Sequence, residues 1–313
     1  MHPDEVHVDV AVVRRLVTQF PKWAGLPIQE VTPWGTDNAV YRLGDDKVVR
    51  LPRTPRTSGT LEMERYWLTR LGPQLPLATP VPLAEGKPSG GYPFTWSVYR
   101  WLPGEPATPD RIADPIQLAI DLARFISALQ RIDTSGGPPP GEVNVFRGEP
   151  LARRDSATRA AIASLQAELD AAVLTADWDE ALATPEWEGP SVWLHGDLDS
   201  RNLLAHDGRL SAVIDFGTLS VGDPACDVMA AWKLLSADGR RAFRRALAVD
   251  EATWIRARGW AISQSVSALA YYTEETNAVL VREARRWLRE LLDERVTRSA
   301  YRPGPSAAAE RPG

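Results

Sequence analysis

Apolar residues recur at helical spacing in several long stretches of the chain. Within residues 115–132, Leu118, Leu122 and Leu129 fall on one stripe, as in an amphipathic helix. Similar spacing predicts helical structure over residues 5–20, 60–71, 151–183, 252–272 and 277–296. Most of the chain after residue 115 is therefore predicted to be helical.

Other apolar runs predict strands. Residues 38–52, "NAVYRLGDDKVVRLP", contain two β-rich runs joined by Gly-Asp-Asp, which is a hairpin pattern. Residues 93–102 are rich in aromatic and β-branched side chains and predict a further strand. Two shorter apolar runs, residues 191–194 and 210–216, predict a pair of strands on either side of a polar motif.

These elements predict an α+β chain with two lobes. The expected boundaries are a small β-rich N-terminal lobe over residues 1–100 and a larger, mainly helical C-terminal lobe over residues 101–302. A length of 313 residues agrees with two domains. Residues 303–313, "PGPSAAAERPG", predict a disordered tail.

Composition narrows the possible partners and the location. Lys and Arg total 36 against 41 for Asp and Glu, and this balance disfavours nucleic acid as a partner. No apolar run approaches the roughly 18 residues of a membrane span, so we expect no membrane association. With Cys226 as the only cysteine and no recognisable signal peptide, we expect a cytoplasmic protein.

Polar side chains follow each of the two short predicted strands. Residues 194–202 read "LHGDLDSRN", which contains Asp197 and Asn202, and the second strand ends in Asp215-Phe-Gly. If the two strands pair as a hairpin, the two carboxylates and the amide converge. Such hard oxygen ligands suit Mg²⁺. The alternative is that these residues only form turns.

The predicted helix over residues 60–71 carries a carboxylate on its apolar face. Glu64 lies on the same stripe as Leu61 and Leu68, and a buried carboxylate is costly unless it is paired. Arg50, at the end of the "KVVR" run, is a natural partner. A cation held by a helix glutamate grips nucleotide phosphates in kinases. A structural salt bridge or a solvated helix face is the alternative interpretation.

Taken in order, these motifs resemble those of the aminoglycoside phosphotransferase family, kinase-like enzymes that modify antibiotics and other small metabolites. The resemblance rests on "HGDLDSRN", "VIDFG", "GDPACD" and the small-lobe segments, and runs from about residue 28 to 295. It implies a bilobal protein-kinase-like fold and a γ-phosphoryl transfer from ATP or GTP, with Mg²⁺ as cofactor, to a hydroxyl of a small molecule.

The same resemblance assigns roles to the residues of the large lobe. It implies that Asp197 is the catalytic base or the group that orients the hydroxyl, and that Asn202 and Asp215 are Mg²⁺ ligands. His195 and Asp227 are implied to support the catalytic loop rather than to react.

In the small lobe the resemblance implies a nucleotide site. Arg50 and Glu64 form the phosphate-gripping pair, although many kinases have Lys in place of Arg. Four further residues are expected to contact the nucleotide, two in a polar phosphate loop and two in the hinge whose backbone faces the purine: Thr36, Asn38, Tyr99 and Trp101.

The acceptor is predicted to be a small molecule because only four residues separate Gly217 from "GDPACD", too few for a peptide-docking segment. An aminoglycoside is favoured, and a polycation of that kind needs an acidic pocket. Asp199, Glu274 and Glu275 are the candidates for such a pocket, with residues 146–155 as a lid. The alternatives are a macrolide kinase and a metabolic kinase for choline, homoserine or methylthioribose.

Two other classes are less well supported. A metal-dependent phosphohydrolase using His195, Asp197 and Asp215 usually needs more imidazoles, and the chain has four histidines. An inactive nucleotide-binding regulator would be expected to lack Asp197, Asn202 or Asp215, and all three are present. The pattern does not predict an oligomeric state.

Overall fold

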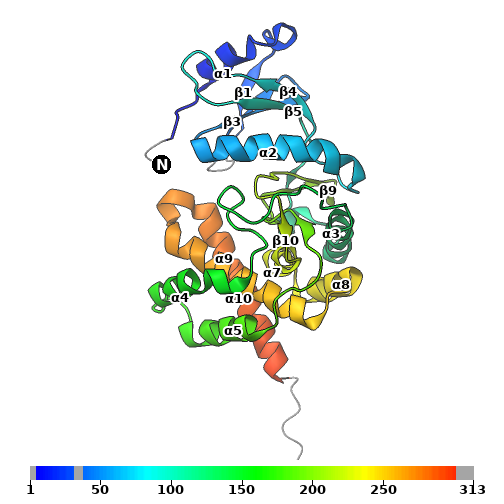
Figure 1. Cartoon of the computed structure of the whole chain (residues 1–313), viewed down its shortest axis with the longest axis vertical. Coiled ribbons are helices and arrows are strands. Elements are labelled where there is room, and N and C mark those ends of the chain that lie inside the picture. Colours follow the sequence, from blue (N-terminus) through cyan, green and yellow to red (C-terminus); the bar gives the residue numbers. More distant parts are fainter. Residues whose placement is uncertain (1–4, 32–37, 301–313) are drawn as a thin grey trace, which may run out of the picture.

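The computed structural model describes residues 5–31 and 38–300, with side chains described up to residue 294. An antiparallel sheet forms the N-terminal part, drawn in blue to cyan in Figure 1, and a mainly helical C-terminal part lies below it. This arrangement confirms the predicted two-lobed α+β fold.

The N-terminal part is built on a five-stranded sheet in the order β1-β2-β3-β5-β4. Its strands are β1 (Ile28–Glu30), β2 (Asn38–Leu43), β3 (Lys47–Pro52), β4 (Pro82–Gly86) and β5 (Trp96–Arg100). The predicted hairpin is confirmed, because β2 pairs with β3 across a turn at Gly44, which has a φ of 61°. Val49, Trp96 and Val98 form the centre of this part's own core.

Helix α1 (Val10–Val17) is shorter than the helix predicted over residues 5–20. Asp9 ends it on the N-terminal side, because its side chain accepts a hydrogen bond from the backbone N–H of Val12. The preceding residues are extended instead, and the Val6 N–H donates to the carbonyl of Arg53, which directly follows β3.

Helix α2 (Pro55–Leu71) lies where the two parts meet (Figure 1). It starts one and a half turns earlier than predicted, at the N-cap Thr54 followed by Pro55. Leu61 and Leu68 are buried in the core of the C-terminal part rather than in that of the sheet. This packing holds the face that carries Glu64 against the junction.

The C-terminal part is organised around α9, which contacts α4, α5, α6, α7 and α10. Its helices are α3 (Pro115–Gln130), α4 (Asp155–Ser164), α5 (Ala171–Ala183), α6 (Ala225–Val228), α7 (Ala230–Leu234), α8 (Ala237–Leu247), α9 (Glu251–Tyr271) and α10 (Glu274–Ala300). The described residues of the two parts also form four short 3₁₀ helices, η1 (Pro21–Trp23) and η2 (Gly72–Gln74) in the N-terminal part and η3 (Pro109–Arg111) and η4 (Leu151–Arg154) in the C-terminal part.

The pairing of the short strands differs from the prediction. Strand β7 (Val192–Leu194) pairs with β10 (Ser220–Gly222), while β8 (Leu203–His206) pairs with β9 (Arg209–Val213) and β6 (Glu105–Pro106). The expected hairpin between residues 191–194 and 210–216 is therefore wrong. A hairpin forms instead between β9 and β8, which lies in the expected connection, and it turns at Asp207 and Gly208, whose φ angles are both positive.

Strand β5 ends at Arg100, where the lobe boundary was predicted. The division into domains stays a prediction, and the predicted tail over residues 303–313 lies outside the described residues. Among the helices that the structure describes, none is long and apolar enough to cross a membrane.

Candidate active site

The loop after β7 is held by a buried carboxylate. The backbone N–H groups of His195 and Gly196 donate to the two oxygens of Asp227 at 2.8 and 2.7 Å. Asp227 is inaccessible to solvent, and burial raises its pKa. Gly196 has a φ of 82°, and a Cβ there would lie 2.8 Å from the Thr218 carbonyl oxygen. The loop therefore requires both the glycine and Asp227.

His195 connects this loop to the strand that leads to Asp215. Its Nδ1 accepts from the Asp197 N–H at 3.2 Å, which places the ring proton on Nε2, 3.0 Å from the Ile214 carbonyl oxygen. The ring is fully buried and packs on Phe216. Its position is consistent with the supporting role implied by the sequence.

Asp197 and Asn202 are in direct contact. The Asn202 side-chain NH₂ donates to the Asp197 carbonyl oxygen at 2.8 Å and to its Oδ2 at 3.2 Å. The Ile214 N–H donates to the Asn202 carbonyl oxygen at 2.9 Å. Because Ile214 immediately precedes Asp215, this bond holds Asn202 close to Asp215. The predicted convergence is thus reached through β8 and β9.

Arg50 on β3 joins the two parts of the site. It donates to Glu64 Oε1 at 2.6 Å and to Asp215 Oδ1 at 2.9 Å. Asp215 has a φ of 63° and remains about half exposed, whereas Glu64 is buried. Burial raises the pKa of Glu64 to about 7, against the lowering effect of Arg50. Burial alone would lower the pKa of Arg50, but Glu64 and Asp215 raise it above its ordinary value.

Asp197 lies among cations. Lys233 Nζ is 3.3 Å and Arg147 Nη2 is 3.8 Å from Asp197 Oδ1. Burial would raise the pKa of Asp197, but Lys233, Arg147 and Arg201 outweigh it and hold that pKa well below its usual range. The carboxylate therefore stays ionised and accepts hydrogen bonds.

The three predicted acceptor contacts are not grouped as an acidic pocket. Asp199 is fully buried, bound by the guanidinium of Arg201 at 3.1 and 2.5 Å and lying 3.5 Å from Lys233. Glu274 and Glu275 are exposed in the first turn of α10, and Glu274 pairs with Arg285.

The predicted nucleotide contacts in the small lobe are spread over the sheet. Asn38 opens β2 and is buried, whereas Thr36 lies outside the described residues. The Tyr99 ring is buried, and the Arg50 guanidinium lies 5.8 Å from its centroid. The Trp101 N–H is already bound to the Asp46 carbonyl at 2.8 Å, so it is not free to face a purine.

Sequence reasoning missed Lys233 and gave no role to Arg147 within the proposed lid. Lys233 is buried on the short helix α7, in the apolar run "AAWKLL". A lone cation in such a run signals a buried partner, and this clue could have drawn attention to it. Arg147 follows two residues with positive φ, Val145 and Phe146, a backbone path that the sequence did not indicate.

The donor set fits a magnesium ion. Asp215 offers a half-exposed carboxylate, and Asn202 keeps its amide oxygen because its NH₂ is engaged by Asp197. Mg²⁺ needs few protein ligands, because it keeps waters and takes substrate phosphates. Among the described residues no three His, Cys, Asp or Glu side chains are grouped as an all-protein metal site.

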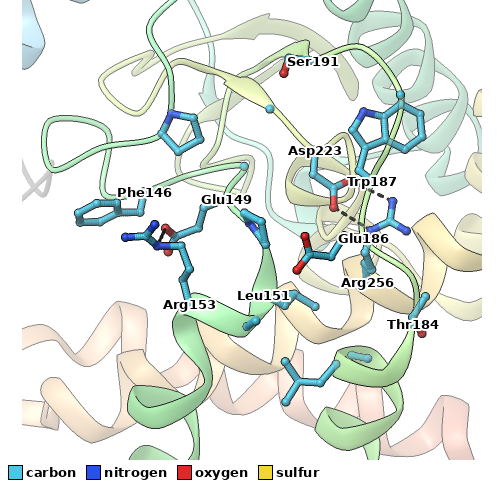
Figure 2. Close-up of a pocket in the computed structure, with 18 of the residues that line it drawn as sticks. Phe146, Glu149, Leu151, Arg153, Thr184, Glu186, Trp187, Ser191, Asp223 and Arg256 are labelled. Carbon is cyan, nitrogen blue, oxygen red and sulfur yellow. Dashed lines mark hydrogen bonds and ion pairs between the residues drawn. The ribbon is translucent and has the colours of Figure 1, made fainter.

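A separate cavity of about 380 Å³ lies beyond the segment that carries Arg147, and Asp197 does not line it. Figure 2 shows its ion pairs, Arg153 with Glu149 and Arg256 with Asp223. Arg153 thus points into this cavity, whereas the adjacent Arg154 donates to Ser263 on α9.

A carboxylate and an amide on a catalytic loop, together with an arginine held by a helix glutamate, define a kinase-type phosphotransferase with a hydroxyl acceptor. The chain belongs to the phosphotransferase enzyme family, whose profile matches residues 29–261. No curated protein gives a significant match to the sequence.

Solved structures share this fold. The GDP complex of wild-type aminoglycoside 2'-phosphotransferase-IIIa has a TM-score of 0.71 at 19% identity, covering 93% of this chain and 100% of that chain. The macrolide 2'-phosphotransferase MphH from Brachybacterium faecium, an apoenzyme, has a TM-score of 0.58 at 24% identity, covering 97% and 99%. The gentamicin complex of APH(2")-IIa gives 0.59 at 16% identity, covering 90% and 97%.

Proposed function

We propose that this protein transfers the γ-phosphoryl group of ATP or GTP to a hydroxyl of a small organic molecule, with Mg²⁺ as cofactor. The observation that carries the proposal is the continuous set of contacts from Glu64 through Arg50 to Asp215, beside the Asp197–Asn202 pair. The GDP complexes of similar structures support a nucleotide as donor.

Each side chain has a distinct part in this reaction. Asp197 is ionised, so it orients the acceptor hydroxyl and takes its proton as the O–P bond forms. Asn202 and Asp215 would hold the metal, which neutralises charge on the phosphates. Arg50, fixed by Glu64, binds phosphate oxygens. His195 and Asp227 keep the loop in shape.

The acceptor hydroxyl belongs to an antibiotic or to a small metabolite. The sequence favours an aminoglycoside, and similar structures include an enzyme bound to gentamicin and two macrolide 2'-phosphotransferases. An antibiotic acceptor would make the protein a resistance enzyme, whereas choline, homoserine or methylthioribose would make it a metabolic kinase. We infer a cytoplasmic enzyme in either case.

A coupled assay of ADP or GDP release tests the proposal. The purified protein is incubated with Mg·ATP or Mg·GTP and a panel of aminoglycosides, macrolides, amino alcohols and sugars. We expect at least one acceptor to raise nucleotide turnover above hydrolysis, with a phosphorylated product seen by mass spectrometry. No binding of Mg·ATP or Mg·GTP would contradict the proposed reaction.

A further inference from the structure

Positive charge accumulates beside Asp197 on the side of the C-terminal helices. Arg147 lies 3.8 Å from Asp197, and Arg154 lies further along the same segment, on η4. Arg154 donates to Ser263 at 2.9 Å, and its guanidinium lies 4.9 Å from the centroid of the Trp260 ring. Within the part of the chain that the structure describes, no carboxylate lies within ion-pair distance of Arg154. Burial and the charge of Arg147 lower its pKa to about 10.

Hydrogen-bond donors outnumber acceptors around this cluster. The side chain of Gln264 has one amide oxygen and two cations beside it. In one orientation this oxygen accepts from Lys233 at 3.4 Å, and with the amide rotated by half a turn it accepts from Arg147 instead. Three of the buried N–H donors that lack an acceptor in the described part of the chain lie near this cluster, namely Arg147 Nε, Trp260 Nε1 and Trp287 Nε1. Lys233 lies over Trp287 and Arg154 over Trp260, so these donors belong to one region.

Neighbouring carboxylates do not compensate for this excess. Asp199 is bound by Arg201, and Glu283, which also contacts Ser200, pairs with Arg286 at 2.7 Å. Glu274 pairs with Arg285 at 2.6 Å, and Glu275 is exposed at the start of α10. A polycation beside Asp197 would therefore lie close to Arg147, which already faces that carboxylate.

We infer that the acceptor of this enzyme carries a carboxylate or another anionic group, bound by Arg147 and Arg154. The inference rests on the proposed function and deepens it by naming the acceptor class. It reverses the expectation of an acidic pocket for an aminoglycoside. An anion at this site could also be the γ-phosphate of the donor, so the test must separate the two sources.

Ligand-observed NMR of three sugars tests the inference on the full chain with Mg·ADP bound. Glucuronate, glucose and glucosamine share a ring and most hydroxyls but are anionic, neutral and cationic, and kanamycin is added as a polycation. We expect glucuronate to bind tightest. Arg154→Gln should weaken glucuronate about tenfold or more, while Mg·ATP affinity measured by calorimetry stays within about twofold.

Arg153→Gln is the matched control. Arg153 is the adjacent arginine but is exposed and faces the cavity of Figure 2, so this variant should bind glucuronate as the wild type does. Equal or tighter binding of glucosamine or kanamycin overturns the inference, as does binding of none of the four. Loss of Mg·ATP affinity in Arg154→Gln also overturns it, because the cluster would then serve the donor phosphate. Failure of the wild type to bind either Mg·ATP or Mg·GTP would instead contradict the proposed function.

Discussion

Asp197 is surrounded by groups that fix both its charge and its position. Lys233 and Arg147 lie within 4 Å of its carboxylate, and the Asn202 amide holds its backbone and Oδ2. A strongly lowered pKa makes it a weak base toward solvent. Its contribution therefore comes from orienting the hydroxyl and accepting a proton only as the transfer proceeds.

Replacing Asp197 by alanine should lower kcat by about 10²- to 10⁴-fold, the usual worth of a positioned acid–base group. The KM of Mg·ATP should change little, because the phosphate-binding groups remain. Steady-state kinetics with the best acceptor measures both, and Asp110→Ala, at an exposed site, is the control. Near-normal kcat in Asp197→Ala would show that another group performs this role.

Glu64 introduces a pH dependence into nucleotide binding. Its pKa is raised to about 7, so lowering the pH through that value protonates it and removes the charge that holds Arg50. We expect the KM of Mg·ATP to rise between about pH 8 and pH 6 in the wild type. Glu64→Gln should show the higher KM at both pH values. A KM that is the same at both pH values in the wild type would contradict this role.

Sequence patterns predicted the candidate site residues whose position depends mainly on the strand, loop or helix that carries them. Asp197 and Asp215 lie two to three residues after β7 and β9, Asn202 directly precedes β8, and Glu64 occupies the apolar face of its helix. Lys233 reaches Asp197 only because α7 packs under the catalytic loop, a contact 36 residues apart in the chain. Such a contact depends on tertiary packing, so the local pattern indicates a buried cation without identifying its partner.

At the scale of elements, the packing of α2 in the C-terminal core fixes the position of Glu64 on the nucleotide side of the site. Its buried leucines belong to the larger core, and Glu64 projects from the same face. Leu68→Ala should therefore lower the free energy of unfolding by about 2–5 kcal/mol, through lost burial and a residual cavity.

Chemical denaturation monitored by circular dichroism measures this change. Glu62→Ala, on the exposed face of α2, is the matched control and should change the unfolding free energy by less than about 0.5 kcal/mol. A loss of stability in Leu68→Ala no larger than in Glu62→Ala would show that α2 is not anchored in the C-terminal core.

Long periodic elements were predicted more accurately than short ones. The predicted ranges for α3 and α9 agree with the structure to within two residues, because their apolar spacing is sustained. Strand β8 was missed, since residues 203–206 precede a turn and were taken as part of the connection. Strand pairing could not be derived, because β7 meets β10 through contacts distant in sequence.

At the scale of the whole molecule, the site depends on both parts of the chain. Arg50 and Glu64 come from the sheet and α2, whereas Asp215 and Asp197 come from loops of the C-terminal part. The Arg50–Asp215 ion pair joins these two groups of site residues. A nucleotide bound there would therefore join the two lobes.

Calorimetric titration of Mg·ATP into the wild type and Asp215→Ala tests the central claim most directly. The wild type should bind ATP more tightly with Mg²⁺ than without it, and Asp215→Ala should lose that difference. Asp207→Ala, at an exposed turn, should bind as the wild type does. Unchanged Mg²⁺-dependent affinity in Asp215→Ala would contradict a metal–nucleotide site at the junction of the lobes.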